Sequence, residues 1–141
     1  MSEQQYKIFI LASHPVVGEL IAYRLRLHDL QPILLDSEQE LNDALGEYLP
    51  QTFMIDLDMA NCDGIQLVEK LASDEVTSRV PILCMSAEGD LDRAEQAFRA
   101  GGRDFLVIPF DPIVLEEKVT RLLEQFEERQ TQDEEQKAAA V

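Results

Sequence analysis

Short apolar runs alternate with segments of helical periodicity along most of the chain. Five runs are dominated by apolar residues, and they read KIFILA at 7–12, PILL at 32–35, FMIDL at 53–57, PILCMS at 81–86 and DFLVI at 104–108. Runs of this length without regular polar alternation are typical of strands that are covered on both faces of a parallel sheet. The pattern therefore predicts five buried strands.

Each apolar run is followed by apolar residues at helical spacing, and several of these segments carry boundary signals. Pro15 lies just inside the first, Ser37 to Glu40 form a capping-box sequence, and Gly101-Gly102 closes the fourth as a C-cap. Asp111-Pro112 begins the last, whose apolar face ends at Phe126. Strict alternation of strands and helices predicts an α/β fold around a parallel sheet with right-handed crossovers.

The chain length and the final segment suggest one domain with an extension. A chain of 141 residues fits a single domain, which we assign to residues 1–126. Residues 127–137 are Glu, Gln, Arg, Asp and Lys with one Thr, so residues 127–141 are either a charged helical extension or a disordered tail. Good helix formers favour the extension. A short coiled coil is the rival interpretation, although no apolar heptad repeat supports it.

The charge balance limits the kinds of partner. The formal net charge is −16, which argues against nucleic acid and against anionic lipid, because both attract basic surfaces. A protein with a basic surface is the expected partner. The sequence has no apolar run long enough to span a membrane and no basic segment at its start, so we expect a cytoplasmic protein.

The cysteines and histidines give no metal or redox signature. Cys62 and Cys84 form no CxxC motif, so both are expected to be free thiols. His14 has no partner at ligand spacing and is expected to be a solvated loop residue, with a pH-sensitive group or a weak metal ligand as the alternatives. His28 stands at a helix end, where a histidine favours the helix dipole.

Sites in parallel sheets form at the carboxyl ends of the strands. Asp56 ends the third run and is predicted to be a single exposed carboxylate at the end of the central strand. The other strand-end segments are Ala12-Ser13-His14, Ser86-Ala87-Glu88 and Ile108-Pro109.

Four motifs at these strand ends point to one family. Residues 56–64 read DLDMANCDG, 80–87 read VPILCMSA, 100–106 read AGGRDFL, and Pro109-Phe110 follows. Over about residues 6–126 the chain resembles the receiver domain of two-component response regulators. The resemblance implies a flavodoxin-like, three-layer fold with five helices and a five-stranded parallel sheet in the order 2-1-3-4-5.

The resemblance also implies roles for three residues. Asp56 matches the phospho-acceptor, while Ser86 and Phe105 match the hydroxyl and the aromatic that respond to the phosphoryl group. From the residues alone, Ser86 is equally suited to hydrogen-bond Asp56 or to cap the following loop. The family pattern makes a cis bond before Pro109 plausible.

The departures from the family pattern fall on the chemistry. Ala12-Ser13, or Ser13-His14, stand where two acidic residues would hold Mg²⁺, Ile108 replaces a lysine, and Ala60 replaces a proline. Asp58 follows at the strand end and is expected to point away from Asp56. Loss of one cationic or donor group typically costs ~10²–10³ in rate. We therefore expect little phosphorylation at Asp56, no metal site apart from weak Mg²⁺ binding, no cofactor and no catalytic residue.

These features favour an atypical receiver, or pseudo-receiver, that acts in two-component or phosphorelay signalling as a protein-interaction module and not as an enzyme. Its expected partners are a histidine kinase or a downstream signalling protein, and a homodimer through the last two helices and the fifth strand is a further option. We expect a stand-alone protein with no output domain after residue 141. The alternative is a conventional receiver phosphorylated on Asp56. A small phosphatase of the DxD type is a remote alternative. Its motif belongs on the first strand, whereas Asp56-Leu57-Asp58 lies at the third apolar run.

Overall fold

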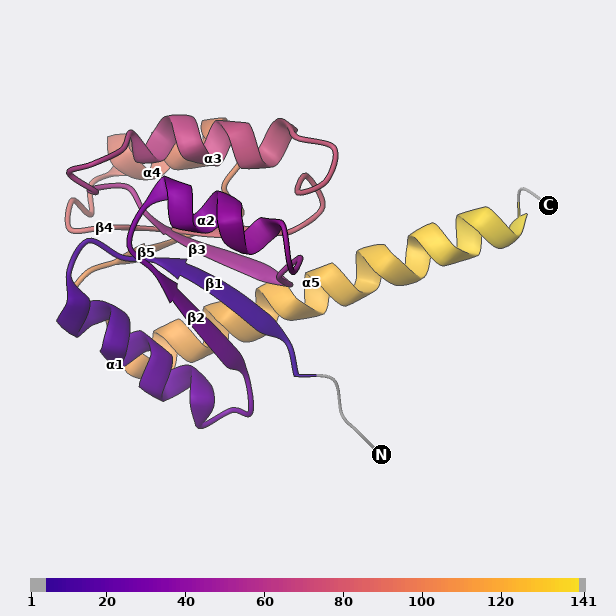
Figure 1. Ribbon diagram of the computed structural model, residues 1–141, viewed down its shortest axis with the longest axis horizontal. Helices are drawn as coiled ribbons and strands as arrows, with labels where there is room; N and C mark the ends of the chain where they lie inside the picture. The colour runs from indigo at the N-terminus through magenta and orange to yellow at the C-terminus, as the bar shows by residue number, and fades with distance from the viewer. Residues whose placement is uncertain (1–4, 140–141) are drawn as a thin grey trace.

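The computed structural model describes residues 5–139 (Figure 1). Strands and helices alternate without exception, in the order β1 (Lys7–Leu11), α1 (Pro15–Arg26), β2 (Gln31–Leu35), α2 (Glu38–Leu45), β3 (Thr52–Asp56), α3 (Gly64–Ser73), β4 (Ile82–Ser86), α4 (Leu91–Ala100), β5 (Asp104–Val107) and α5 (Pro112–Ala139). All five predicted strands and five predicted helices are confirmed, with small shifts at their ends.

The five strands form one parallel sheet in the order β2-β1-β3-β4-β5, as predicted. The central strand β3 pairs with β1 on one side and with β4 on the other. In this register Leu11 is level with Ile55, and Asp56 is level with Met85. The carboxyl ends of β1, β3 and β4 therefore meet at one edge of the sheet, which places the segments that follow them side by side.

Helices cover both faces of the sheet (Figure 1). Alternate residues of the strands pack toward opposite layers: Phe9 and Phe53 join α2, α3 and α4 in one apolar cluster, and Ile8 and Met54 join α1 and α5 in the other. Strands β3 and β4 are buried along their whole length, as predicted, but the edge strands β2 and β5 are only partly covered. An edge strand has a neighbour on one side only, so its side chains remain partly open to solvent.

Local signals explain where the helices begin and end. Asp63 and Asp90 cap α3 and α4 by accepting hydrogen bonds from backbone N–H groups. Gly101 ends α4 with φ of 117°, a left-handed conformation that glycine adopts without strain.

The capping box at the start of α2 forms only in part. Ser37 Oγ accepts the Glu40 N–H at 3.1 Å. The Glu40 carboxylate accepts the N–H of Asp36 at 2.7 Å instead of that of Ser37. The N-cap is still Ser37, and only the reciprocal hydrogen bond is displaced by one residue toward the N-terminus.

The last helix continues past the apolar face that ends at Phe126 and projects from the body of the domain (Figure 1). The charged segment is helical as far as Ala139. It contacts the domain through a hydrogen bond between Tyr6 and Glu127 and through an ion pair between Arg79 and Asp133. Within residues 5–139, no helix is long and apolar enough to cross a membrane.

Candidate functional site

Asp56 lies at the end of β3 beneath the segment that follows β1. Its Oδ2 accepts hydrogen bonds from the N–H of Ser13 at 2.9 Å and from Ser13 Oγ at 2.5 Å. Its Oδ1 accepts the N–H of Asp58 at 2.8 Å. The prediction that Asp56 is exposed is wrong, because the residue is only 1% exposed. A buried carboxylate needs hydrogen-bond donors, and the chain supplies three.

The Asp58 carboxylate is directed away from Asp56, as expected, and turns toward β4 and α4. Strand alternation is not the reason, because residues two apart on a strand share a face and Asp58 lies in the turn that follows β3. Its carboxylate accepts from Ser86 Oγ at 3.0 and 3.1 Å, from the Ala87 N–H at 2.8 Å and from Arg93 Nη2 at 3.1 Å. Burial alone would raise the pKa of Asp58. The hydrogen bonds from Ala87, Arg93 and Ser86 and the positive charge of Arg93 outweigh it, and the pKa lies below its usual value. Asp58 is therefore ionised at neutral pH.

Ser86 is fully buried at the end of β4. Its Oγ accepts the Glu88 N–H at 3.0 Å, so the interpretation of Ser86 as a cap of the next loop is confirmed. The hydroxyl donates to Asp58 and not to Asp56. Ser86 therefore links the end of β4 to the residue two positions after Asp56.

Arg93 is a site residue that the sequence analysis missed. It lies in the first turn of α4, three residues after the N-cap Asp90. Its Nη2 also donates to the Leu57 carbonyl at 3.0 Å, and its Nη1 donates to Gln96 Oε1 at 3.0 Å. The strand-end segment after β4 ends at Glu88, and Arg93 lies in the first turn of the helix that follows. The first turn of each helix is therefore part of this edge of the sheet, and a basic residue there is the signal that identifies Arg93.

The remaining predicted site residues, Ala12, Ile108 and Phe105, supply no polar side chain. Ile108 is half-buried against the apolar cluster on the α1 and α5 side, and Ala12 packs against the same cluster. The bond between Ile108 and Pro109 is cis, as the family pattern suggested. Phe105 packs against the opposite cluster and is level with Cys84 in the sheet. Ile108 and Phe105 thus belong to different layers of the fold.

The cysteines and His14 behave as predicted within the described residues. Cys62 and Cys84 are free thiols. Burial raises the pKa of Cys84 to about 12, so this thiol is protonated at neutral pH. His14 is exposed just before α1 and makes no side-chain hydrogen bond to cap that helix.

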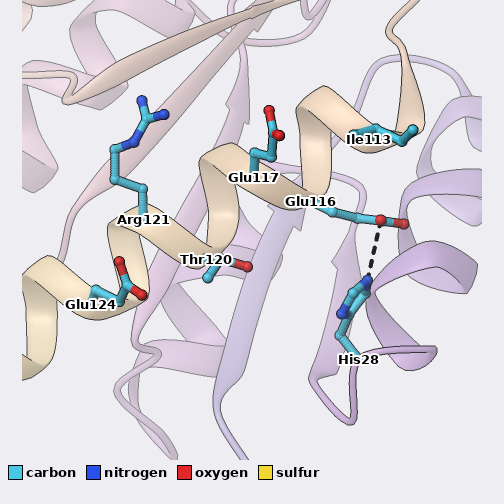
Figure 2. A pocket seen from close by; sticks show the side chains of 7 residues that line it. All are labelled: His28, Ile113, Glu116, Glu117, Thr120, Arg121 and Glu124. Carbon is cyan, nitrogen blue, oxygen red and sulfur yellow. Dashed lines mark ion pairs between the residues drawn. The ribbon is translucent and has the colours of Figure 1, made fainter.

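A groove runs along α5 (Figure 2). It is lined by His28, Ile113, Glu116, Glu117, Thr120, Arg121 and Glu124. Glu116 is held by Arg24 Nη2 at 2.6 Å and by His28 Nε2 at 3.2 Å. The prediction that His28 serves the dipole of its own helix is therefore incomplete, because its ring pairs with a carboxylate of α5. The groove contains none of the strand-end residues.

Comparisons with known proteins agree with this architecture. Residues 8–120 match the response regulator receiver domain family. The chain is 26% identical over 105 residues to the phosphate regulon transcriptional regulatory protein PhoB of Pseudomonas aeruginosa, covering 74% of this chain and 46% of that protein. It is 28% identical over 121 residues to the DNA-binding dual master transcriptional regulator RpaA of Synechocystis sp., covering 82% of this chain and 47% of that protein. The chain thus spans about half the length of these two relatives.

A solved structure shows the same fold. The chemotaxis response regulator CheY4 of Vibrio cholerae superposes with a TM-score of 0.78 at 16% identity, covering 84% of this chain and 99% of that one. The order of the strands and the motif around Asp56 lead to the same assignment as the family match. The chain belongs to the response regulator receiver domain family and is a receiver domain of two-component signalling.

Proposed function

We propose that this receiver domain acts through recognition by a protein partner and that transfer of a phosphoryl group to Asp56 is not required. The observation that carries the proposal is the pair formed by Asp56 and Ser13. A hydroxyl and an N–H group, both donors, occupy the place beside Asp56 where a second carboxylate would hold a metal ion.

The donor set around Asp56 does not fit Mg²⁺. Mg²⁺ needs near-octahedral oxygen coordination, usually anchored by one or two carboxylates. Asp56 accepts three hydrogen bonds within the chain, and the Asp58 carboxylate is directed at Ser86, Ala87 and Arg93. Within residues 5–139 no group of three or more His, Cys, Asp and Glu side chains is arranged to hold a metal ion. We therefore infer that Asp56 and Asp58 do not form a Mg²⁺ site and that the proposed function uses no metal cofactor.

Ile108 stands where the family pattern has a lysine, so this position supplies no cation for phosphoryl transfer. Phosphoryl transfer to a carboxylate places negative charge next to negative charge, and catalysis depends on neutralising it. Ile108 offers an apolar side chain at the end of β5. Arg93 is the nearby cation, and its guanidinium is engaged with Asp58 and with the Leu57 carbonyl.

The surface suited to a partner lies over α4, β5 and α5. Five large apolar side chains are exposed there: Leu91, Phe98, Val107, Ile113 and Val114. Large exposed apolar side chains on these three elements make them a candidate for a protein-interaction surface. The net charge of −16 favours a signalling protein with a basic rim, such as a histidine kinase or a downstream component. A homodimer through the same apolar surface is the alternative, and the like charges of the two copies oppose it. We place this function in the cytoplasm.

An NMR titration tests the proposal. Amide spectra are recorded with and without saturating Mg²⁺ and beryllofluoride, which mimics a phosphoryl group. We expect the amide signals of Asp56, Ser86 and Phe105 to remain unchanged. Shifts at these three residues that disappear in Asp56→Asn would contradict the proposal and would identify a conventional, phosphorylated receiver.

A further inference from the structure

The outer face of α1 carries a row of large apolar side chains. They are between 49% and 78% exposed, and they are Val16, Leu20, Tyr23 and Leu27. The opposite face of the helix holds the buried residues Gly18, Ile21, Ala22 and Leu25. The inner face of α1 is therefore used within the domain, while the outer apolar face is open to solvent. A contiguous apolar face of this kind is typical of an interaction site.

The four exposed side chains follow the spacing of a coiled-coil seam. Starting from Val16, they recur after four, three and four residues, which is the alternation of the d and a positions of a heptad. A stripe with this spacing runs along one narrow line of a helix, and in coiled coils it is covered by a second helix that lies along it. The spacing therefore favours a helix as the element that covers α1.

One acidic and one basic residue flank the stripe on the same side. Glu19 and Arg26 are seven residues apart, which is about two helical turns, and both are exposed. Neither forms an ion pair within the part of the chain that the structure describes. On the other side of the stripe, Arg24 pairs with Glu116 of α5 at 2.6 Å. The side away from α5 thus has one free charge of each sign, toward opposite ends of the helix.

These flanking charges make α1 complementary to an antiparallel copy of itself. Around a two-fold axis each surface meets the same surface of the other copy. In that arrangement Glu19 of each copy faces Arg26 of the other copy, so two identical ion pairs form. A parallel pair would instead bring Glu19 toward Arg24 of the other copy, whose guanidinium is engaged with Glu116. The charges therefore favour the antiparallel orientation.

The charge of α1 differs from that of the chain as a whole. Its span Pro15–Arg26 contains one acidic and two basic residues, which gives a formal charge of +1, whereas the chain carries −16. At physiological ionic strength, charges farther away than about 8 Å are largely screened. Repulsion between two copies is therefore weaker at α1 than the net charge alone suggests.

We propose that two copies of this chain associate through an antiparallel pair of α1 helices, with their exposed apolar stripes facing each other. The ion pairs between Glu19 and Arg26 set the orientation. The inference goes beyond the proposed function, which concerns a different protein and the surface over α4, β5 and α5. Helix α4 packs on the face of the sheet opposite to α1, so the dimer leaves it uncovered (Figure 1).

The expected dimer is weak, because two short helices bury less than the standard interface of about 800 Å² per partner. We expect a dissociation constant between about 10 μM and 1 mM. Sedimentation equilibrium of the full chain, without Mg²⁺ or beryllofluoride, measures it. The average mass should rise from the 16.0 kDa of the monomer toward twice that value as the concentration increases. A chain that stays monomeric up to about 1 mM overturns the proposal.

Leu20→Glu tests the apolar stripe. It places a charge at the centre of the interface on a side chain that is exposed in the monomer, and we expect the dissociation constant to rise at least about tenfold. Leu91→Glu is the matched control, because Leu91 is an exposed leucine of α4, and the association should be unchanged. Loss of association in Leu91→Glu, or its persistence in Leu20→Glu, overturns the proposal.

A charge exchange tests the orientation. Glu19→Arg and Arg26→Glu should each weaken the association by about three- to tenfold, because each replaces two ion pairs by two repulsive contacts. An equimolar mixture of the two variants should associate more strongly than either alone, since each copy then supplies the charges that the other needs. A mixture that associates no better than the separate variants overturns the antiparallel arrangement. Asp56 is unchanged throughout, so failure here is separate from failure of the proposed function.

Discussion

Ser13 Oγ lies 2.5 Å from Asp56 Oδ2, and the Ser13 backbone N–H donates to the same oxygen at 2.9 Å. Ser13 alone, in the segment after β1, therefore supplies two donors to a carboxylate that is 1% exposed. Hydrogen bonds to a buried ionised group stabilise a protein more than bonds between neutral groups. Asp56 is therefore held within the packing between β1 and β3 and is not open to a ligand.

We predict that Ser13→Ala lowers the free energy of unfolding by about 1–3 kcal/mol, since it removes one donor from a buried charged acceptor. Urea denaturation measures the change. Ser73→Ala is a matched control, because the Ser73 hydroxyl donates to the backbone carbonyl oxygen of Glu69 on the exposed surface of α3. We expect a change of less than about 0.5 kcal/mol there. Equal effects of the two substitutions would show that the bond to Asp56 adds nothing.

Ser13→Asp should create the metal response that the chain lacks. The substitution places a second carboxylate beside Asp56, and two like charges at hydrogen-bond distance repel each other in a buried site. Without Mg²⁺ we expect the variant to unfold at a lower temperature than Ser13→Ala. Added Mg²⁺ should raise that temperature, because a ligand that binds the native state stabilises it.

Thermal unfolding with MgCl₂, against NaCl at the same ionic strength, measures this effect. The wild type should show the same unfolding temperature in both salts. Equal stabilisation of the wild type and of Ser13→Asp by MgCl₂ would mean that the native donor set already accepts the ion, which contradicts our interpretation of Ser13.

The sequence was sufficient for the fold because its signals there are local. The apolar runs, the N-cap residues Asp63 and Asp90 and the left-handed position of Gly101 all lie within a few residues of the boundaries they determine. Asp56 lies at the end of β3 as predicted, and of the two roles that the sequence leaves open for Ser86, the cap of the next loop is the one observed. The family motifs added the order of the strands.

The details that the sequence did not predict depend on contacts between distant segments. Asp56 is buried because the chain around Ser13 folds over it, and Arg93 reaches Asp58 only through the packing of α4 against the end of β3. The pairing of His28 with Glu116 likewise joins two helices that are far apart in the sequence. No spacing rule within one element encodes these contacts.

Gly64 is predicted to be essential for the geometry around Asp56. A Cβ atom at this position would lie 2.6 Å from the Leu57 Cα and 3.1 Å from the Asp56 carbonyl oxygen. Because both are backbone atoms, the start of α3 or the end of β3 must move. We expect Gly64→Ala to lower the free energy of unfolding by about 1–3 kcal/mol, the usual cost of overpacking, and to shift the amide signals of Asp56 and Asp58.

The control for Gly64 is Gly46→Ala, at the exposed C-cap of α2. The backbone there has φ of −69°, and an added Cβ would meet only the Asp43 carbonyl oxygen at 3.2 Å. We expect a change of less than about 1 kcal/mol and no shift at Asp56. If Gly64→Ala behaved in the same way, the close approach of α3 to Leu57 would not constrain the site.

The contact between Tyr6 and the extended part of α5 should be visible at high pH. A hydrogen bond to Glu127, burial and the negative charge of Glu127 together raise the pKa of Tyr6 from 10.0 to about 12. The native state therefore holds the phenol proton more tightly than the unfolded state. The resulting stabilisation is fully present below pH 10 and is lost as the pH rises toward 12.

Tyrosinate absorbance should show one of the three tyrosines ionising late, and Tyr6→Phe should remove that late step. Glu127→Gln should move the step to lower pH, whereas Tyr23→Phe, which alters an exposed ring, should leave it in place. A late step that survives in Tyr6→Phe would mean that α5 does not dock on Tyr6 beyond Phe126.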